Sequence, residues 1–401
     1  MNVTGRASAA ALLIFALSVA SAEAAENVSW TYDPPIGANP DSSPPACPTS
    51  STTGNLVKST VDEVSLKGSG NQVGPIEKVV DHVERLGGGV VELPGGTWTI
   101  DSGIEVPSDV TLEGKGEGVT TLEAGADFLR TKGPFGGYPM VYARDSVNVT
   151  VENLSLDQRG QKLNAAQVGG RLNEMMLEDA YSSNVLFYNV ETEDPFEYSV
   201  GELSASRFCF SGDTTQANTS GLYNQLDGFH MDNGSDGDVT DDYADQCNGT
   251  DGDDAIALQA WGGSVSDIDI SDDIACSGSD TTLKLAETES TDSIYDVAAE
   301  DNTFEDSGGG VYTAYYPDGG SIYDVNIVDN TFDDIEPADV VDIEPPAGGR
   351  VRNTLVEHNT YCGPGAIALA SGVGNIESGN HPDSDQLLSC PLSVRATDLA
   401  P

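Results

Sequence analysis

Residues 302–361 decide the fold, and they read NTFEDSGGGVYTAYYPDGGSIYDVNIVDNTFDDIEPADVVDIEPPAGGRVRNTLVEHNTY. The triplet Asn-Thr followed by an aromatic residue occurs three times in this stretch, starting at Asn302, Asn330 and Asn359, at spacings of 28 and 29 residues. Between the copies lie short β-forming runs and turns rich in Gly, Asp and Asn, with no room for a long helix. Such a repeat predicts a β-solenoid whose successive coils stack their strands in parallel.

A second repeat has nearly the same period. Six short segments place mostly apolar residues on both sides of a variable middle residue, so that in a strand the flanks point inward and the middle residue outward. The middle residues, spaced by 26 to 30 residues, are His230, Ala257, Lys284, Tyr312, Asp342 and Ala368. We expect them to form one column on the outside of the solenoid. A leucine-rich repeat is the alternative, but its consensus of leucine and asparagine is absent.

The N-terminal part of the chain differs from the repeats. An apolar run over residues 9–20 follows a basic residue and precedes small residues at 22–24, which is typical of a secretory signal peptide. We therefore expect residues 1–24 to be removed and the protein to be secreted into the extracellular medium. Residues 25–60, with their Pro pairs and a Ser/Thr cluster, predict a flexible leader. No segment reaches the roughly 20 apolar residues of a membrane span, so we expect no membrane insertion.

Residues 61–401 are predicted to form a single β-helix domain, and we expect it to be a monomer. Its helix candidate runs from Pro75 to Leu86. The apolar residues on one face of this helix are Ile76, Val79, Val80 and Val83. We expect the short helix to cap the N-terminal end of the solenoid, because an open end exposes an unpaired strand edge.

The composition is strongly acidic. Asp and Glu total 66 against 17 Lys and Arg, which gives a formal net charge of -49. This charge excludes a nucleic-acid partner, which needs a basic surface. In molar salt the Debye length falls to about 3 Å and screens the repulsion, so the composition favours a halophilic protein. A disordered acidic chain is the alternative, but 38% of the residues are hydrophobic and occur in patterned segments.

The spacing of the cysteines matches the length of a coil. Cys247 and Cys276 are 29 residues apart, and Cys362 and Cys390 are 28 apart. Because stacked coils bring such residues within reach of each other, we expect both pairs to form disulfides. The two remaining cysteines, Cys47 and Cys209, are a weaker third pair.

Two segments near the N-terminus resemble a known superfamily. Residues 87–98 (GGGVVELPGGTW) and 106–114 (VPSDVTLEG) resemble the first coil of the pectate-lyase-like right-handed β-helices. From about Met140 onward the order of segments is similar to glycoside hydrolase family 28, the polygalacturonase family, and the resemblance spans roughly the whole mature domain. It implies a right-handed parallel β-helix that hydrolyses a polysaccharide.

Three short segments carry the resemblance to family 28. They are 194–196 (DPF), which lie where the family has a residue trio before its catalytic coils, 225–230 (QLDGFH), which resemble its Asn-Thr-Asp segment, and 252–258 (GDDAIAL), which resemble its Gly-Asp-Asp segment. The resemblance implies that Asp253 is the general acid and that Asp227 and Asp254 are the base, acting by inversion.

The repeat alone brings the same acids together. Asp227 and Asp254 each lie three residues before a column residue, so their backbones should be one coil apart, about 4.8 Å. If the turn lets Asp253 project beside them, three carboxylates converge, and crowded like charges do not all ionise near neutral pH. One then keeps its proton while another activates water, with separations of about 6.5–9.5 Å usual for inverting enzymes.

A solvated acidic face without catalysis is the alternative. Other acidic pairs occur at Asp241-Asp242, Asp272-Asp273 and Asp333-Asp334. The pair at 253–254 differs because it directly precedes an apolar triplet, and Asp227 has the matching place one coil earlier.

Lys284 is the only Lys or Arg between Arg207 and Arg350. On the column it would bind a sugar carboxylate or sulfate, or lower the pKa of a neighbouring carboxyl group. The alternative is an ion pair with one of the acids of the site or with Asp280. We expect Asp280 to lie with Lys284 at the substrate.

Two further column residues are candidate substrate contacts. His230 would bond a sugar hydroxyl or shift the pKa of an Asp, and the alternative is a solvent-facing spacer. Tyr312 would stack on a sugar ring, and the alternative is ordinary packing on the strand face.

The chain also departs from the family pattern. The family's Gly-His-Gly segment falls at 280–282 (DTT), so its histidine is missing. Its Arg-Ile-Lys segment falls at 312–314 (YTA), so both cations that hold galacturonate are missing. These departures favour a neutral or differently charged glycan, or an inactive relative.

Two other functions share the fold. A polysaccharide lyase would use Lys284 or Tyr312 to abstract the proton beside a uronate carboxyl group, with the Asp cluster holding Ca²⁺. A noncatalytic glycan-binding solenoid of a cell surface or virion would have no turnover. The hydrolase needs no cofactor, and a polysaccharide is its only expected partner.

Overall fold

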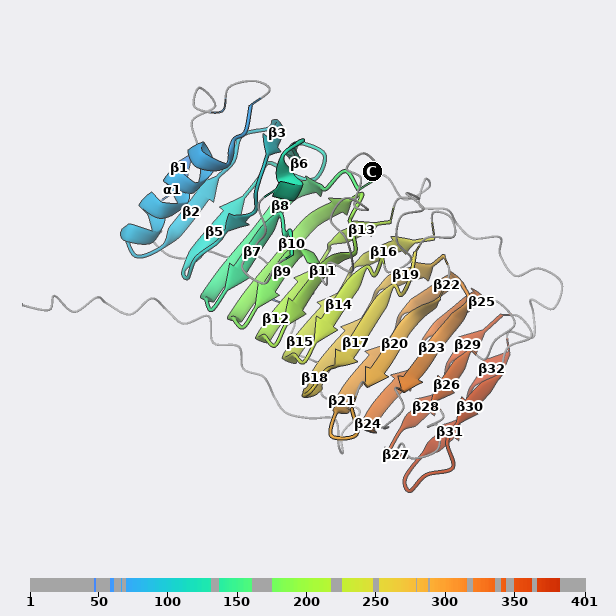
Figure 1. Cartoon of the computed structure of the whole chain (residues 1–401). Helices are drawn as coiled ribbons and strands as arrows, with labels where there is room; N and C mark the ends of the chain where they lie inside the picture. The colour runs from blue at the N-terminus through green and yellow to red at the C-terminus, as the bar shows by residue number, and fades with distance from the viewer. Residues whose placement is uncertain are drawn as a thin grey trace, which may run out of the picture.

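The computed structural model describes residues 47, 58–60, 66, 70–130, 137–160, 175–217, 226–247, 252–278, 280–287, 289–315, 320–335, 340–343, 350–362 and 366–382. The segment expected to be a signal peptide, residues 1–24, lies outside this part of the chain. In the described part, the strands stack side by side along one axis, from the N-terminal end to the C-terminal end (Figure 1). Each strand pairs in parallel with the corresponding strand one coil away, which confirms the expected right-handed parallel β-helix.

One sheet carries the outer column. Its ten strands, in spatial order, are β4 (Ile104–Glu105), β7 (Val141–Arg144), β9 (Met175–Ala180), β11 (Tyr198–Leu203), β14 (Phe229–Asp232), β17 (Ile256–Ala260), β20 (Thr281–Glu287), β23 (Gly309–Tyr315), β26 (Val341–Ile343) and β30 (Ile367–Leu369).

The second sheet forms the remaining faces of the solenoid. Its strands are β1 (Lys58–Thr60), β2 (Gly89–Glu92), β3 (Gly96–Ile100), β5 (Val110–Glu113), β6 (Thr120–Ala124), β8 (Val147–Asp157), β10 (Ser183–Glu193), β12 (Ser206–Ser211), β13 (Thr214–Gln216), β15 (Ser235–Thr240), β16 (Tyr243–Gln246), β18 (Ser264–Ser271), β19 (Ile274–Ser277), β21 (Ser293–Glu300), β22 (Thr303–Ser307), β24 (Ser321–Val328), β25 (Thr331–Ile335), β27 (Arg350–Arg352), β28 (Leu355–Glu357), β29 (Thr360–Tyr361), β31 (Ile376–Ser378) and β32 (His381–Pro382).

The outer column is in register. Each of its residues pairs with the next across β14, β17, β20, β23, β26 and β30, as the repeat predicts. The flanking residues point into the core, where Phe229, Met231 and Leu258 are fully buried. Because burial of one such side chain stabilises a fold by roughly 1.5–3 kcal/mol, this alternation fixes which residues face outward on every coil.

The Asn-Thr-aromatic repeat forms a buried ladder. Asn302, Asn330 and Asn359 stack inside the solenoid, and each Oδ1 accepts the backbone N–H of the ladder residue one coil earlier where that residue is described. The side-chain Nδ2 of Asn302 donates to Asn330 Oδ1 at 3.0 Å and to the carbonyl of Ile270 at 2.9 Å. Every polar atom of an asparagine amide thus finds a partner within the core.

Three aspartates continue this ladder toward the N-terminus. Asp213 N–H donates to Asp242 Oδ1 at 2.6 Å, Asp242 N–H to Asp273 Oδ1 at 2.9 Å, and Asp273 N–H to Asn302 Oδ1 at 3.0 Å. In an asparagine of this stack, such as Asn302, the side-chain Nδ2 donates two hydrogen bonds. The corresponding atom of each of these aspartates is Oδ2, and it has no hydrogen-bond partner. We call the whole stack, Asp213, Asp242, Asp273, Asn302, Asn330, Asn359 and Asn380, the Asn/Asp ladder.

Many of the remaining aspartates occupy corners of the coils. Asp241, Asp272, Asp301 and Asp329 occupy the same corner of four successive coils, with φ between 56 and 59°. Asp and Asn tolerate this left-handed region better than other residues with a side chain. The acidic pairs Asp241-Asp242 and Asp272-Asp273 are therefore not simply a solvated face, because the second Asp of each pair belongs to the Asn/Asp ladder.

The N-terminal helix α1 spans Val73–Arg85 and lies against β2 at the first coil (Figure 1). The prediction of 75–86 was close. The helix begins two residues earlier because Pro75 fits within a first turn, where its missing N–H costs no hydrogen bond. Val73, Ile76, Val80 and Val83 are buried against the solenoid, which makes the helix the expected cap.

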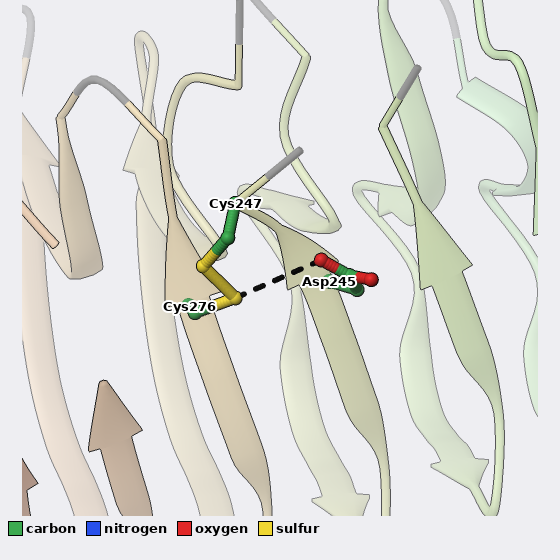
Figure 2. Close-up of side chains that lie close together, drawn as sticks. All are labelled: Asp245, Cys247 and Cys276. Atoms are coloured by element: carbon green, nitrogen blue, oxygen red, sulfur yellow. Dashed lines mark hydrogen bonds between the residues drawn. A yellow bond between two sulfur atoms is a disulfide. The ribbon is translucent and has the colours of Figure 1, made fainter. Parts of the chain in front are cut away.

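Disulfides tie several coils together. Cys247 and Cys276 are bonded as predicted, beside Asp245 (Figure 2). The weaker pair, Cys47 with Cys209, also forms. Cys362 is disulfide-bonded, while its predicted partner Cys390 lies outside the described residues. Cys47 and strand β1 both fall within the segment 25–60, so parts of the predicted leader are attached to the solenoid.

Among the described helices, none is long and apolar enough to cross a membrane.

Candidate active site

Asp227, Asp253 and Asp254 lie together at the start of β14 and β17. One carboxylate oxygen from each lies within 4.8 Å of the others. All three side chains are buried, with Asp227 3%, Asp253 8% and Asp254 2% exposed, so Asp253 is the most accessible. We call these residues the acid trio.

The stacking of the coils orients two of these carboxylates. Asp227 Oδ1 accepts the backbone N–H of Asp254 at 3.2 Å, one coil further along the solenoid. Asp254 Oδ1 accepts the hydroxyl of Thr281 at 2.7 Å and its backbone N–H at 3.4 Å, again one coil further. Both side chains therefore point along the solenoid axis toward the next coil, which brings Asp227 beside Asp254.

The neighbouring coil also fixes the backbone of Asp253. Its N–H donates to the carbonyl of Leu226 at 3.3 Å. The hydroxyl of Ser277, which directly follows the disulfide-bonded Cys276, donates to the carbonyl of Asp253. Three different coils thus hold the segment that carries the acid trio.

The proximity of these acids raises the pKa of two of them. Burial, followed by the charges of Asp227 and Asp254, raises the pKa of Asp253 to about 8. Burial and the charge of Asp227 raise the pKa of Asp254 to about 7, although Lys284 opposes this rise. At neutral pH the arrangement therefore favours a protonated Asp253.

Lys284 forms the ion pair that was the alternative interpretation of this residue. Its Nζ lies 2.8 Å from Asp254 Oδ2 and 3.0 Å from Asp280 Oδ2. Burial alone would lower the pKa of Lys284, but the charge and hydrogen bond of Asp254 raise it well above its ordinary value. The ammonium group is thus a permanent positive charge between two carboxylates.

His230 does not face solvent, so its interpretation as a solvent-facing spacer was wrong. The side chain is 3% exposed, and Nδ1 lies 2.7 Å from Asp227 Oδ2, within hydrogen-bond distance. Its ring stacks on the ring of Tyr198, with centroids 4.0 Å apart and planes 10° apart. Burial lowers the pKa of His230, but the hydrogen bond and charge of Asp227 outweigh it, and the pKa is raised.

Tyr198 is a site residue that sequence reasoning missed. It lies three residues before Gly201, and Gly201 pairs with His230 in the column. Asp227 and Asp254 lie three residues before their own column residues, so the same rule of spacing places Tyr198 at this edge of the sheet. An aromatic residue at that position one coil before the acids was the available signal.

Other predicted contacts lie along the same face. Tyr312 pairs with Lys284 one coil away and is 41% exposed, so its ring is available to a ligand. Asp280 is partly exposed beside Lys284. In the other direction Glu178 pairs with Gly201, and burial raises its pKa to about 7. The face is therefore lined by carboxyl groups on both sides of the acid trio.

The oxygens of the acid trio are close enough to share a metal cation. Two of the three residues, however, already have a nitrogen partner within the protein. Asp227 Oδ2 contacts His230 Nδ1, and Asp254 Oδ2 contacts Lys284 Nζ. This arrangement supplies positive charge from the protein itself and leaves the acid trio suited to proton transfer.

The fold and these carboxyl groups define a class, namely right-handed parallel β-helix proteins with an acidic site on one sheet. No protein-family model and no curated protein sequence matches the chain. Solved structures do match it in fold. An exopolygalacturonase from Thermotoga maritima is 14% identical with a TM-score of 0.62, and the match covers 81% of this chain and 91% of that one.

Two further structures are similar. A polygalacturonase from Erwinia carotovora is 14% identical with a TM-score of 0.60, over 83% of this chain and 99% of that one. The tailspike protein of the E. coli bacteriophage HK620, solved with a pentasaccharide, is 14% identical with a TM-score of 0.56, over 79% of this chain and 61% of that one. The protein therefore has a right-handed parallel β-helix fold similar to that of these polygalacturonases and this tailspike, and the reaction has to be argued from the site.

Proposed function

We propose that the protein is a glycoside hydrolase that cleaves a polysaccharide with a pair of carboxyl groups acting as acid and base. The observation that carries the proposal is the convergence of three buried carboxyl groups from two coils within 4.8 Å. Glycosidic cleavage needs one protonated and one ionised carboxyl group at the same bond. The acid trio offers both at neutral pH.

Asp253 is the general acid in this proposal. Its raised pKa, about 8, keeps a proton available for the leaving oxygen, and it is the most exposed of the three. Asp227 and Asp254 hold the attacking water. Their Oδ2 atoms face His230 and Lys284, and the positive charge of Lys284 opposes the rise in the pKa of Asp254.

A neutral glycan suits this face better than a polyuronate. Within the described strands, Lys284 is the only Lys or Arg in the outer column, and two carboxylates already neutralise it. Glu178 and Asp342 add further carboxyl groups on either side. An anionic substrate would meet repulsion along this face.

The lyase alternative has less support with Lys284 as its base. Removal of a proton by Lys284 needs a neutral amine, but its two ion pairs raise its pKa and keep it charged. A lyase would release unsaturated products that absorb ultraviolet light and would lose activity in chelator, so both observations separate it from the hydrolase.

The proposal extends to secretion and to activity in concentrated salt. The disulfides Cys47–Cys209 and Cys247–Cys276 fit an oxidising compartment. The net charge of -49 fits a medium in which repulsion is screened.

A reducing-sugar assay against a panel of glycans in molar salt tests the proposal. We expect hydrolysis of at least one neutral polysaccharide, and Asp253→Asn should lower kcat by about 10²- to 10⁴-fold because it removes the general acid. Asp301→Asn is the matched control, since Asp301 is an exposed corner residue whose backbone conformation Asn also adopts. Equal rates for Asp253→Asn and the control would refute the assignment.

Stereochemistry tests the proposed inversion separately. The closest oxygens of the acid trio lie within 4.8 Å, less than the roughly 6.5–9.5 Å usual between carboxyl groups of inverting enzymes. This separation leaves no room for a water molecule directly between the acid and the base. Inversion therefore requires the attacking water to lie to one side, in contact with Asp227 and Asp254. Proton NMR of the first product should show the inverted anomer, and a retained anomer would replace inversion by a covalent mechanism.

A further inference from the structure

We propose that His230 and Tyr198 are positioning residues of the acid trio: Tyr198 holds the imidazole ring in place, and the ring holds Asp227 in the orientation that activates water. The inference rests on the proposed function. In this proposal His230 orients the base Asp227 and does not contact the sugar.

The ring of His230 has little freedom to move. It lies flat on Tyr198 and is almost fully buried. Its column neighbours are the small residues Gly201 and Ala257, which leave room for the stacked pair. A Cβ atom at Gly201 would lie 2.2 Å from the carbonyl oxygen of His230, so the two backbones approach too closely for a larger residue.

The spacing along the chain selects the ring nitrogen that is used. Asp227 lies in the turn before β14, three residues before His230, so the carboxylate is reached by Nδ1, the nitrogen nearer the backbone. Nδ1 carries a proton in the cation and in one neutral tautomer, and it donates to the carboxylate in both. The contact therefore persists whether or not the ring is charged.

This contact completes the restraint of Asp227. One oxygen accepts the N–H of Asp254 and the other accepts Nδ1–H of His230. The carboxylate plane is thereby fixed, and the lone pairs that remain are directed at one place beside the trio. A misplacement of about 1 Å in such a group costs about 100-fold in rate.

The charged groups around the ring favour the same arrangement. Asp227 and Asp232 come from the turn and strand of the same coil, Asp254 comes from the next coil, and Tyr198 comes from the preceding coil. These carboxylates favour a positive ring and so raise the pKa of His230 against the effect of burial.

Paired substitutions of His230 test the proposal. The amide nitrogen of Asn lies where Nδ1 lies, whereas that of Gln lies where the distant Nε2 lies. His230→Gln should lower kcat by about 100-fold with a much smaller change in KM, and His230→Asn should recover a clear part of the loss.

Substitutions of Tyr198 test the stacking. Tyr198→Phe keeps a flat ring and should lose less activity than Tyr198→Ala. A rise in KM with unchanged kcat in His230→Gln would mean that His230 contacts the sugar, and equal losses in the Asn and Gln variants would mean that Nδ1 does not matter. Either result overturns the proposal.

Imidazole ¹⁵N NMR separates this inference from the proposed function. The Nδ1 signal of His230 should show a bound proton in the wild-type protein and should shift in Asp227→Asn and Tyr198→Ala. Absence of any hydrolysis by the wild-type protein would refute the hydrolase, while the spectrum would still decide whether the ring is held on Asp227. An Nδ1 without a proton in the wild-type spectrum would overturn the positioning role on its own.

Discussion

Lys284 and His230 play parallel parts at the level of single residues. Each is a column residue that bonds Oδ2 of an aspartate, and each of these aspartates lies three residues before a column position. The contacts differ in direction, since His230 bonds an acid of its own coil and Lys284 bonds an acid of the preceding coil. The two side chains therefore bond neighbouring acids without competing for one of them.

Loss of the charge at Lys284 should move the pH dependence of the reaction. A nearby cation lowers the pKa of a carboxyl group, so Lys284→Gln should raise the pKa of Asp254 above its present value of about 7. The acidic limb of kcat/KM should then shift to higher pH, with less activity at neutral pH. Lys284→Arg keeps the charge and serves as control. An unchanged acidic limb in Lys284→Gln would show that Asp254 is not the ionised group that limits the rate.

The sequence placed the acids of the site correctly in space but not the contacts of their neighbours. The positions of Asp227 and Asp254 follow from a repeat that is visible in the chain. His230 is buried on the outer face of the sheet, where its ring stacks on Tyr198, which comes from another coil and belongs to no motif of the sequence. A side-chain rotamer decided by a neighbour one coil away leaves no periodic signal.

At the level of elements, the Asn/Asp ladder joins two kinds of rung. The asparagines donate through Nδ2 to the next rung and to a backbone carbonyl, whereas Asp213, Asp242 and Asp273 have only acceptor oxygens when ionised. Burial raises the pKa of all three well above its ordinary range. A protonated carboxyl group has an O–H and reproduces part of the asparagine pattern.

The ladder should make stability depend on pH. Because the folded-state pKa of these aspartates is raised, the fold binds their protons more tightly than the unfolded chain does. Their stabilisation is full below the ordinary pKa of about 3.9 and is lost as pH rises toward the folded-state value. Asp242→Asn restores a donor, and it should raise the unfolding free energy at pH 7 by about 1–3 kcal/mol and weaken the pH dependence.

Chemical unfolding of Asp242→Asn and wild type from pH 4 to pH 8 checks this prediction. Asp301→Asn removes one charge from an exposed corner and accounts for the general effect of lower net charge. A variant Asp242→Asn that is less stable than the wild type at pH 7 would show that the ladder requires a carboxyl group.

The sequence pattern identifies only three of the seven residues of this ladder. The triplets at Asn302, Asn330 and Asn359 share a recognisable pattern, but Asp242 and Asp273 follow another Asp and resemble surface acids. Composition cannot separate the two members of such a pair. Their burial follows from the turn of the chain at the corner, where Asp241 and Asp272 take the left-handed conformation and the next residue enters the core.

At the level of the whole molecule, the corner aspartates are arranged in rows. Asp241, Asp272, Asp301 and Asp329 repeat once per coil, so that like charges lie along the length of the solenoid. A parallel row of Asp236, Asp267, Asp296 and Asp324 has the same conformation, and the charges of its neighbours Asp267 and Asp324 add to burial in raising the pKa of Asp296 to about 6. Repulsion within these rows opposes the folded state unless salt screens it.

Salt should therefore stabilise the protein strongly. We expect the Tm to rise continuously from low ionic strength to molar NaCl or KCl, because the Debye length falls from about 30 Å at 0.01 M to about 3 Å at 1 M. Thermal unfolding at a series of salt concentrations measures the effect. A Tm that is flat over this range would contradict the halophilic interpretation of the charge.

Neighbours in this molecule are almost always one coil apart in sequence, and that has a mechanical consequence. A pull on the two ends would detach the outermost coil first, and each detachment would lengthen the tether by roughly 95 Å, the span of about 28 extended residues. The disulfide between Cys247 and Cys276 joins two successive coils. Under load this disulfide would keep the residues between Cys247 and Cys276 from extending. The increase in length would therefore be smaller when the coil that carries Asp253 and Asp254 detaches.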